Sequence, residues 1–299
     1  MRMIFYFAQL IYVIILTNQW YVLYLACIMV MSAYVQRRGL IYPLLNKLTV
    51  FVPSKRLFVV ITSAVAGVLP IAGRVSVSAG ILDTIAPKDD RRKHYGILDY
   101  LSTHHYYLWS PFEKSVIIPM AVLSLSYGEF MQLMWPLTVI AVVVPFILIF
   151  TLLKEDDVIV QTQQREYAQV EWVNWQLLTA VMVIIMLGNY VREHTDIIKT
   201  YLEDNDLSIV SAAWIGFAAS FLLGSSSRFA AFTAILASIF GVEFLPLFFA
   251  IDYTGYMLSP THKCFAIGKM YFNTSFVTYY THIILLCSLI IAVAFFLVA

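Results

Sequence analysis

The chain has 299 residues, of which 19 are Lys or Arg and 18 are Asp or Glu, so its formal net charge is +1. Charged residues make up 12% of it, about half of the ~25% usual in soluble domains, whereas hydrophobic residues make up 61%. A soluble globule of this size cannot bury so much apolar side chain, which excludes a soluble enzyme and a disordered protein. The lack of a basic excess excludes a nucleic-acid partner. The sequence therefore predicts an integral membrane protein.

The first apolar segments, 3–17 and 20–33, are predicted to form a tight pair of helices that turns at Asn18-Gln19. No small-residue cleavage site precedes a soluble domain. We therefore interpret residues 1–19 as a retained transmembrane segment rather than as a cleaved signal peptide.

Three apolar blocks without charge, 131–153, 173–191 and 276–298, are long enough to cross a ~30 Å hydrocarbon core as helices. Strands of an outer-membrane barrel would instead alternate apolar and polar residues in segments of ~10 residues. The pattern predicts an all-α polytopic membrane protein.

Other apolar stretches are too short to cross the membrane. They form two pairs, at about 57–85 and 209–240, and each pair surrounds a tip of small or polar residues that ends in Arg74 or Arg228. Short helical arms around such a tip predict a re-entrant hairpin. Its irregular backbone is tolerated at that depth only where it is buried in protein or lines a wet cavity.

An internal repeat follows the hairpins. Tyr107-Leu-Trp-Ser-Pro-Phe-Glu-Lys114 and Tyr256-Met-Leu-Ser-Pro-Thr-His-Lys263 share four of eight residues, and each run lies downstream of one hairpin. Interrupted hydrophobic segments at corresponding places in two halves are typical of transporter binding sites.

The charges of the loops predict that the two halves are inverted. The loops 36–56 and 86–94, around the first hairpin, are rich in Lys and Arg and are expected to be cytoplasmic. The loop 192–206 leads into the second hairpin and carries two bases against five acids, so it is expected to be external. We predict a first repeat at 20–153, a polar connecting loop at 154–172 and a second repeat at 173–299.

Two Ser-Pro pairs, Ser110-Pro111 and Ser259-Pro260, are interpreted as helix starts, because Ser is a good N-cap and Pro suits the first helical position. A helix that begins inside the membrane directs free N–H groups and a partial positive charge inward, which favours an anion. The alternative is that both helices begin at the membrane interface.

The arginines Arg74 and Arg228 are candidates for bidentate binding of a carboxylate or phosphate, with a structural ion-pairing role as the alternative. Asp252 is expected to pair with Arg228 or Lys263, or to carry a coupling proton. The further substrate-binding candidates are polar residues of the tips and of the Ser-Pro runs: Ser76, Ser78, Ser225, Ser226, Ser227 and His262. The candidates for a coupling Na⁺ or H⁺ are Gly73, Asp252, Ser226 and Thr261.

Neither catalysis nor a metal site is predicted. The three cysteines, Cys27, Cys264 and Cys287, lack paired spacing, and His104-His105 are adjacent instead of four residues apart. We find no His-Glu-x-x-His, no Gly-x-Ser-x-Gly with a positioned His and no Walker loop. An intramembrane enzyme and ATP-driven transport by this chain are therefore not expected.

Several motifs resemble a family of uncharacterised prokaryotic integral membrane proteins of the ion-transporter superfamily, which is related to the gluconate, citrate and arsenite permeases. The motifs are Leu69-Pro-Ile-Ala-Gly73 with Ser78-Ala79, Gly224-Ser-Ser-Ser227, Gly255-Tyr-Met-Leu-Ser-Pro-Thr-His-Lys-Cys264 and Tyr271-Phe272. The two arginines depart from the family pattern, which has small residues at their positions.

The resemblance implies a secondary transporter of a small organic or inorganic anion in the inner membrane. It also implies two inverted repeats with one re-entrant hairpin each, a homodimer, and no cofactor besides Na⁺ or H⁺ as coupling ion. An anion channel and a membrane assembly or scaffold protein without transport activity are the alternatives.

Overall fold

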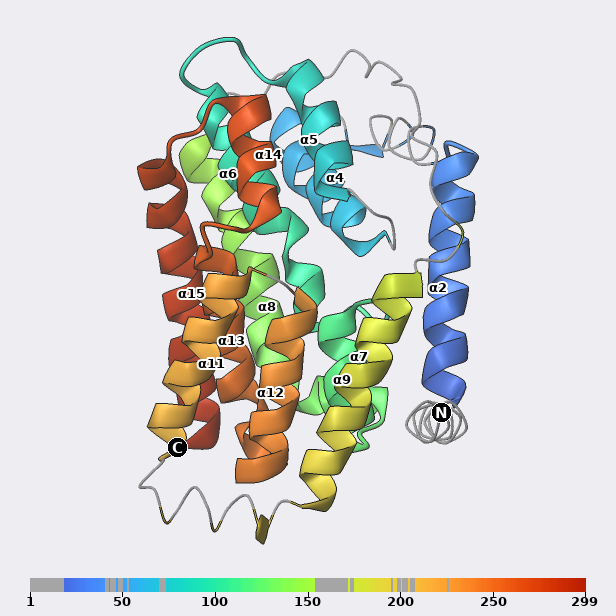
Figure 1. Ribbon diagram of the computed structural model, residues 1–299. Helices are drawn as coiled ribbons and strands as arrows, with labels where there is room; N and C mark the ends of the chain where they lie inside the picture. Colours follow the sequence, from blue (N-terminus) through green and yellow to red (C-terminus); the bar gives the residue numbers. More distant parts are fainter. Residues whose placement is uncertain are drawn as a thin grey trace.

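The structure is a computed structural model, and its described residues are mostly helical, as the sequence predicts (Figure 1). It describes residues 19–40, 43, 47, 51–52, 54–69, 74–153, 172, 175–194, 196–197, 200, 204, 208–224 and 226–299. The predicted transmembrane segment at 1–19 and the connecting loop at 154–172 lie almost entirely outside this part of the chain.

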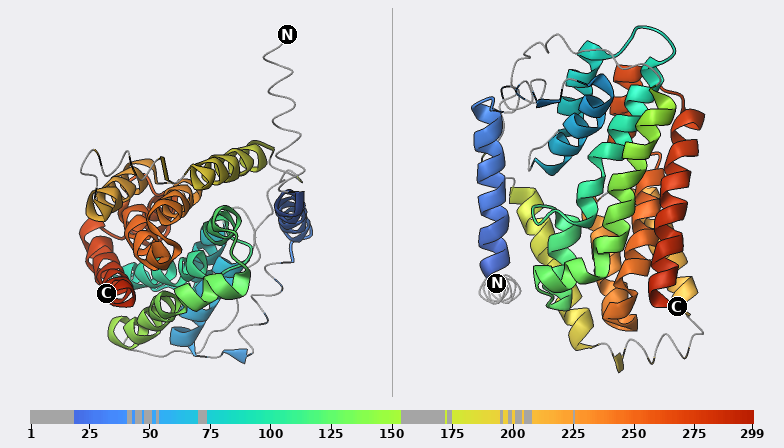
Figure 2. Two further views of the ribbon diagram at one scale, coloured as in Figure 1. Left: turned by 90° about the horizontal axis from the view of Figure 1, so that it is seen from below. Right: turned by 180° about the vertical axis from the view of Figure 1, so that it is seen from behind.

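Two helices of the described part are long and apolar enough to cross a membrane: α8 (Tyr127–Leu152) and α15 (Phe276–Val298). Both begin at a serine whose side chain accepts a hydrogen bond from a backbone N–H three residues on, Ser126 from Glu129 and Ser275 from Thr278. They pack against each other and run in opposite directions (Figures 1 and 2). Their length and composition favour association with a membrane.

The two expected hairpins are pairs of shorter helices, α4 (Lys55–Val68) with α5 (Arg74–Ile85), and α11 (Ile209–Leu223) with α12 (Ser226–Phe240). In each pair the first helix is capped by a serine side chain, that of Ser54 or Ser208. At ~1.5 Å per residue, helices of 14 and 15 residues reach only ~21–23 Å. The two pairs occupy opposite ends of the molecule (Figure 1).

A broken helix follows each hairpin. The first consists of α6 (Arg92–Thr103), the short 3-10 helix η1 (His105–Leu108) and α7 (Lys114–Leu123). The second consists of α13 (Leu245–Leu258) and α14 (Lys263–Phe272), and a short 3-10 turn, η2 (Val242–Phe244), precedes it. The two broken helices run through the molecule in opposite directions, so that α7 lies beside α12 and α14 lies beside α5 (Figure 1).

The joints after the broken helices also match. The helix α7 ends at Ser124, with φ 55°, and α14 ends at Asn273, with φ 51°, so both stop at a residue in the left-handed conformation. Two residues later the caps of α8 and α15 begin. The helices α4 to α8 and α11 to α15 therefore follow the same order, and each set has a serine cap on its first and last helix and a left-handed residue after its fourth.

A glycine permits the close packing of the hairpin on the broken helix in each half. A Cβ on Gly67 of α4 would lie 2.6 Å from the carbonyl oxygen of Thr103, and one on Gly255 of α13 would lie 2.5 Å from that of Phe217. The two remaining long helices, α2 (Gln19–Arg37) and α9 (Trp175–Glu193), lie together at the edge of the molecule, where α9 contacts α7 and α12.

Candidate functional site

The two Ser-Pro pairs form the same turn twice. The hydroxyl oxygen of Ser110 accepts a hydrogen bond from the backbone N–H of Phe112 (3.4 Å), and that of Ser259 accepts one from Thr261 (3.3 Å). The carbonyl oxygens of the two serines accept from Glu113 (3.0 Å) and His262 (3.1 Å).

This geometry corrects the predicted helix starts. The helices α7 and α14 begin three residues after the prolines, at Lys114 and Lys263, with Glu113 and His262 as N-cap residues. The serine hydroxyls close a tight turn instead of capping a helix, so the prolines precede the first helical turn and do not begin it. The breaks themselves lie within the two matching sequence runs.

The two broken helices meet at Tyr107 and Tyr256, which hold the same place in these runs. Their hydroxyl oxygens lie 2.7 Å apart, and the rings are 5.3 Å apart between centroids at 81°. Both side chains are buried. Equivalent residues of the two halves therefore touch each other in the interior, next to both Ser-Pro turns.

The tip of the first hairpin is attached to the first Ser-Pro turn by Arg74. One guanidinium nitrogen donates to the backbone oxygen of Gly67 (3.0 Å) and the other lies 2.5 Å from Oε2 of Glu113. The guanidinium also covers the ring of Tyr106, with Cζ 3.8 Å from the centroid. These contacts correspond to the structural pairing role considered for Arg74. Of the nearby candidates, Ser78 is buried and donates to Val75 O (3.1 Å), and Ser76 is half-buried.

The tip of the second hairpin lies against the second Ser-Pro turn at Gly224, which ends α11 with φ 52°. A Cβ at this position would lie 2.3 Å from Oγ1 of Thr261 and 2.8 Å from Oγ of Ser259. Ser226, the first residue of α12, is half-buried. The remaining candidates at the tips fall on residues or side chains outside the described part of the chain: Gly73, Ser225, Ser227 and Arg228. Each hairpin tip thus contacts the Ser-Pro turn of its own half.

Each half also buries a carboxyl group between its broken helix and its hairpin. Oδ2 of Asp252 accepts a hydrogen bond from Thr233 of α12 (2.8 Å), and Oδ1 has no partner among the described residues. Oδ1 of Asp99 accepts one from Ser63 of α4 (2.7 Å). Of the two partners expected for Asp252, Lys263 is not one, since the carboxylate is fully buried and Lys263 is exposed, and the side chain of Arg228 lies outside the described part. Asp99 was missed, although it is an isolated acid within the stretch 95–101.

The imidazole of His262, the last residue of the second Ser-Pro turn, is buried inside the protein. Its Nδ1 is 3.2 Å from the carbonyl oxygen of Tyr256 and 3.0 Å from the hydroxyl of Tyr100. Its Nε2 lies 3.2 Å from Nε2 of His104. The spacing within the sequence predicted no role for His104, because its partner lies 158 residues away.

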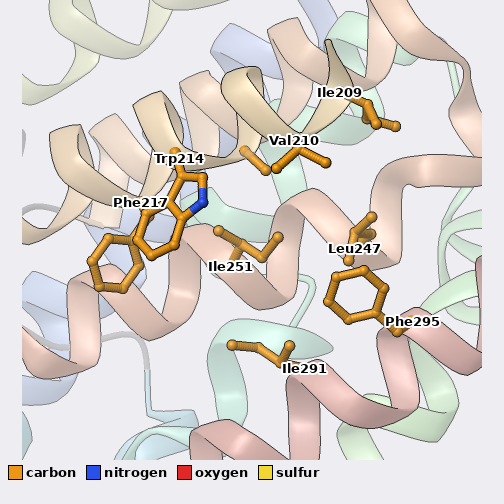
Figure 3. A pocket seen from close by; sticks show the side chains of 9 residues that line it. Ile209, Val210, Trp214, Phe217, Leu247, Ile251, Ile291 and Phe295 are labelled. Atoms are coloured by element: carbon orange, nitrogen blue, oxygen red, sulfur yellow. The ribbon is translucent and has the colours of Figure 1, made fainter.

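A separate hollow of about 280 Å³ lies between α11, α13 and α15 and is lined by hydrophobic side chains, among them Trp214, Phe217 and Phe295 (Figure 3). It offers no partner to a charged ligand. Its apolar lining does not suit the anion that the sequence predicts.

Comparisons with protein-family models, with curated proteins and with solved structures find no match to this chain. The site is therefore interpreted from its geometry.

Proposed function

We propose that the chain is a polytopic inner-membrane protein that transports a small organic or inorganic anion as a symporter or exchanger. The observation that carries this proposal is the pair of Ser-Pro turns, each in contact with the hairpin tip of its own half and joined by Tyr107 and Tyr256 (2.7 Å between hydroxyl oxygens). Two equivalent breaks that meet in the interior of a helical bundle are typical of carriers with a site at the membrane midplane.

Inverted repeats are supported by matched elements. The two halves share two short hairpin helices, a broken helix interrupted by a Ser-Pro turn, and a long apolar helix after a left-handed joint. Their broken helices run in opposite directions, as do α8 and α15 (Figure 2). These features also agree with the resemblance to the ion-transporter superfamily, from which we propose a homodimer.

The proposal of an anion rests on the resemblance and on the N-termini of α7 and α14, which begin beside the turns. Free N–H groups and the helix dipole favour negative charge there. Arg74 is engaged by Glu113 and Gly67, so we assign to it the positioning of the hairpin instead of the main contact with the substrate.

Coupling is proposed at the buried carboxyl groups, Asp99 and Asp252. Among the described residues neither carboxyl group is paired with a cation, and a buried unpaired carboxylate is costly, so we propose that each group holds a proton or a small cation such as Na⁺. Both contact a hairpin helix, through Ser63 and Thr233. A cation bound there would therefore influence the position of the hairpin.

The test is a ligand screen followed by flux measurements on the purified chain. Carboxylates, phosphonates, sulfonates and inorganic oxyanions are screened by thermal shift, because a ligand that binds only the folded state raises its stability. Hits are tested in proteoliposomes for saturable uptake and counterflow. A non-saturating, voltage-dependent current would instead indicate a channel, and the absence of both binding and flux for every anion would contradict the proposal.

A further inference from the structure

Three potential metal ligands lie together in the interior, on two segments far apart in the sequence. One ring nitrogen of His104, one ring nitrogen of His262 and the sulfur of Cys264 all lie within 4.8 Å of one another. The two imidazoles are 0% and 3% exposed, and their Nε2 atoms are 3.2 Å apart.

The hydrogen bonds at the opposite ring nitrogens define the tautomers. Nδ1 of His104 lies 2.6 Å from the carbonyl oxygen of Tyr100, and a carbonyl oxygen only accepts, so this nitrogen carries the hydrogen. Nδ1 of His262 faces the carbonyl oxygen of Tyr256 (3.2 Å). It also faces the hydroxyl oxygen of Tyr100, whose own hydrogen is donated to Met257 O (2.8 Å). Nδ1 of His262 is therefore a donor as well.

When both rings are neutral, each Nε2 thus carries a lone pair, and the two lone pairs face each other. Two such acceptors at 3.2 Å repel unless a cation lies between or beside them. Imidazoles that bind a metal characteristically donate the other ring N–H to a carbonyl or carboxylate oxygen, which is the arrangement of both rings here.

We propose that His104, His262 and Cys264 bind one Zn²⁺ ion. Imidazole and thiolate are the ligands that zinc prefers, and Zn–N bonds of ~2.0–2.1 Å in a tetrahedron place the two nitrogens ~3.3 Å apart. On the same basis, the sulfur bound to zinc lies ~3.6 Å from each ligand nitrogen. The three ligand atoms lie within 4.8 Å of one another here, so zinc binding takes a side-chain adjustment of about 1 Å. The described residues supply three ligands, which leaves the fourth position to water or another small ligand.

The charges around the cluster permit a cation. The thiolate of Cys264 would neutralise one of the two positive charges of the metal. The guanidinium of Arg74, which covers the neighbouring Tyr106 ring, is already paired with Glu113. The inference does not depend on the proposed transport function.

The test uses the full chain in detergent, stripped of metal with a chelator and titrated with Co²⁺, which reports its ligands by absorption. The expected result is one Co²⁺ per chain, with the intense d–d bands of a tetrahedral site, a thiolate-to-cobalt charge-transfer band, and displacement by Zn²⁺. Cys264→Ser should remove the charge-transfer band. His104→Gln and His262→Gln should each weaken binding by tenfold or more.

Two controls match the ligand types. Cys287→Ser removes a buried cysteine outside the cluster, and His282→Gln removes a histidine that bonds its own helix at Thr278, so both should keep the spectrum. A wild-type chain that binds no Co²⁺, or binds it without the charge-transfer band, would overturn the proposal and would indicate a proton shared by the two imidazoles. Zinc content is measured on wild-type chain and on Cys264→Ala purified without chelator. If a histidine variant does not fold, equal zinc in those two samples overturns the proposal, and zinc in the wild type alone supports it.

Discussion

The hydroxyl oxygens of Tyr107 and Tyr256 lie 2.7 Å apart, although 149 residues separate them in the sequence. Both tyrosines are three residues before the serine of a Ser-Pro turn. Because the two tyrosines hold the same place in the two matching sequence runs, their contact lies where the two broken helices meet, and we place the centre of the proposed site there. The contact also connects the two chain segments that lead into the two Ser-Pro turns.

The first prediction concerns this contact. Tyr107→Phe and Tyr256→Phe should each lower the free energy of unfolding by about 1 kcal/mol, because one hydroxyl loses a buried partner. The double variant should cost less than the sum, since the second substitution removes a partner that is already missing. Thermal unfolding in detergent measures the stability of the wild type, the two single variants and the double variant. Tyr190→Phe, at a side chain that is 59% exposed, is the control. Strict additivity would argue against a hydrogen bond between the two tyrosines.

The second prediction concerns the ion pair at the first hairpin tip. Arg74→Met leaves Glu113 buried without its cation, so it should destabilise the protein by about 3–5 kcal/mol. The double variant Arg74→Met/Glu113→Met should be more stable than Arg74→Met alone. The exposed pair Arg91–Asp89 (2.8 Å) is the comparison, and Arg91→Met should cost less than about 1 kcal/mol. Equal effects of Arg74→Met and Arg91→Met would contradict the assigned role of Arg74.

The third prediction concerns the second hairpin tip. Gly224→Ala places a Cβ 2.3 Å from Thr261 Oγ1 in a left-handed backbone, so it should lower stability by at least about 1–2 kcal/mol and should reduce transport. Gly128→Ala is the matched control, because its Cβ would meet nothing closer than 4.0 Å within a helix. It should be neutral or stabilising by up to about 1 kcal/mol. A well-tolerated Gly224→Ala would argue against close contact between tip and turn.

The fourth prediction concerns the prolines of the two turns. Pro111→Ala and Pro260→Ala should leave the protein folded, since both prolines precede their helices and Pro111 keeps its carbonyl bond from Tyr24 (2.7 Å). Both should slow transport, because alanine no longer restricts the backbone of the turn. Flux in proteoliposomes and thermal unfolding are measured on the same samples. Wild-type flux in both variants would contradict the proposal that the two Ser-Pro turns form part of the transport site.

The fifth prediction concerns the sidedness of the chain. Single cysteines are placed at Asp90, between α5 and α6, and at Glu243, between α12 and α13, in a background without Cys27. Both positions are exposed, and the two connections that contain them lie at opposite ends of the molecule (Figure 1). The basic loop at 86–94 predicts that an impermeant reagent labels Glu243→Cys in intact cells and Asp90→Cys only after lysis. Labelling of both cysteines from the outside would contradict the predicted inverted topology.

Local features of the fold could be predicted from the sequence. The helical class follows from composition, the arms at 209–240 from their short apolar runs, and the two breaks from the repeated Ser-Pro pairs. The helix starts were displaced by three residues, because a serine hydroxyl can close a turn as readily as it caps a helix. The difference depends on backbone geometry that the residue types do not define.

The contacts of the site could not be predicted, because they join segments far apart. His104 meets His262 across 158 residues and Arg74 meets Glu113 across 39. The partner of Asp252 is only 19 residues away, at Thr233, but threonine is common on apolar helices and carries no distinctive signal. An ionisable residue within an apolar stretch can be recognised from the sequence, whereas its partner requires the fold.

The two buried carboxyl groups, Asp99 and Asp252, also have an electrical consequence. Moving one elementary charge across a membrane changes the free energy by about 2.3 kcal/mol per 100 mV. A monovalent anion that enters a negatively charged cell alone moves against this field. If each carboxyl group releases one cation to the inside per cycle, the net movement is one positive charge inward, and the field then drives accumulation of the anion. We expect uptake into vesicles to rise with an inside-negative potential and to lose this dependence when Asp99→Asn or Asp252→Asn removes one of the two cations.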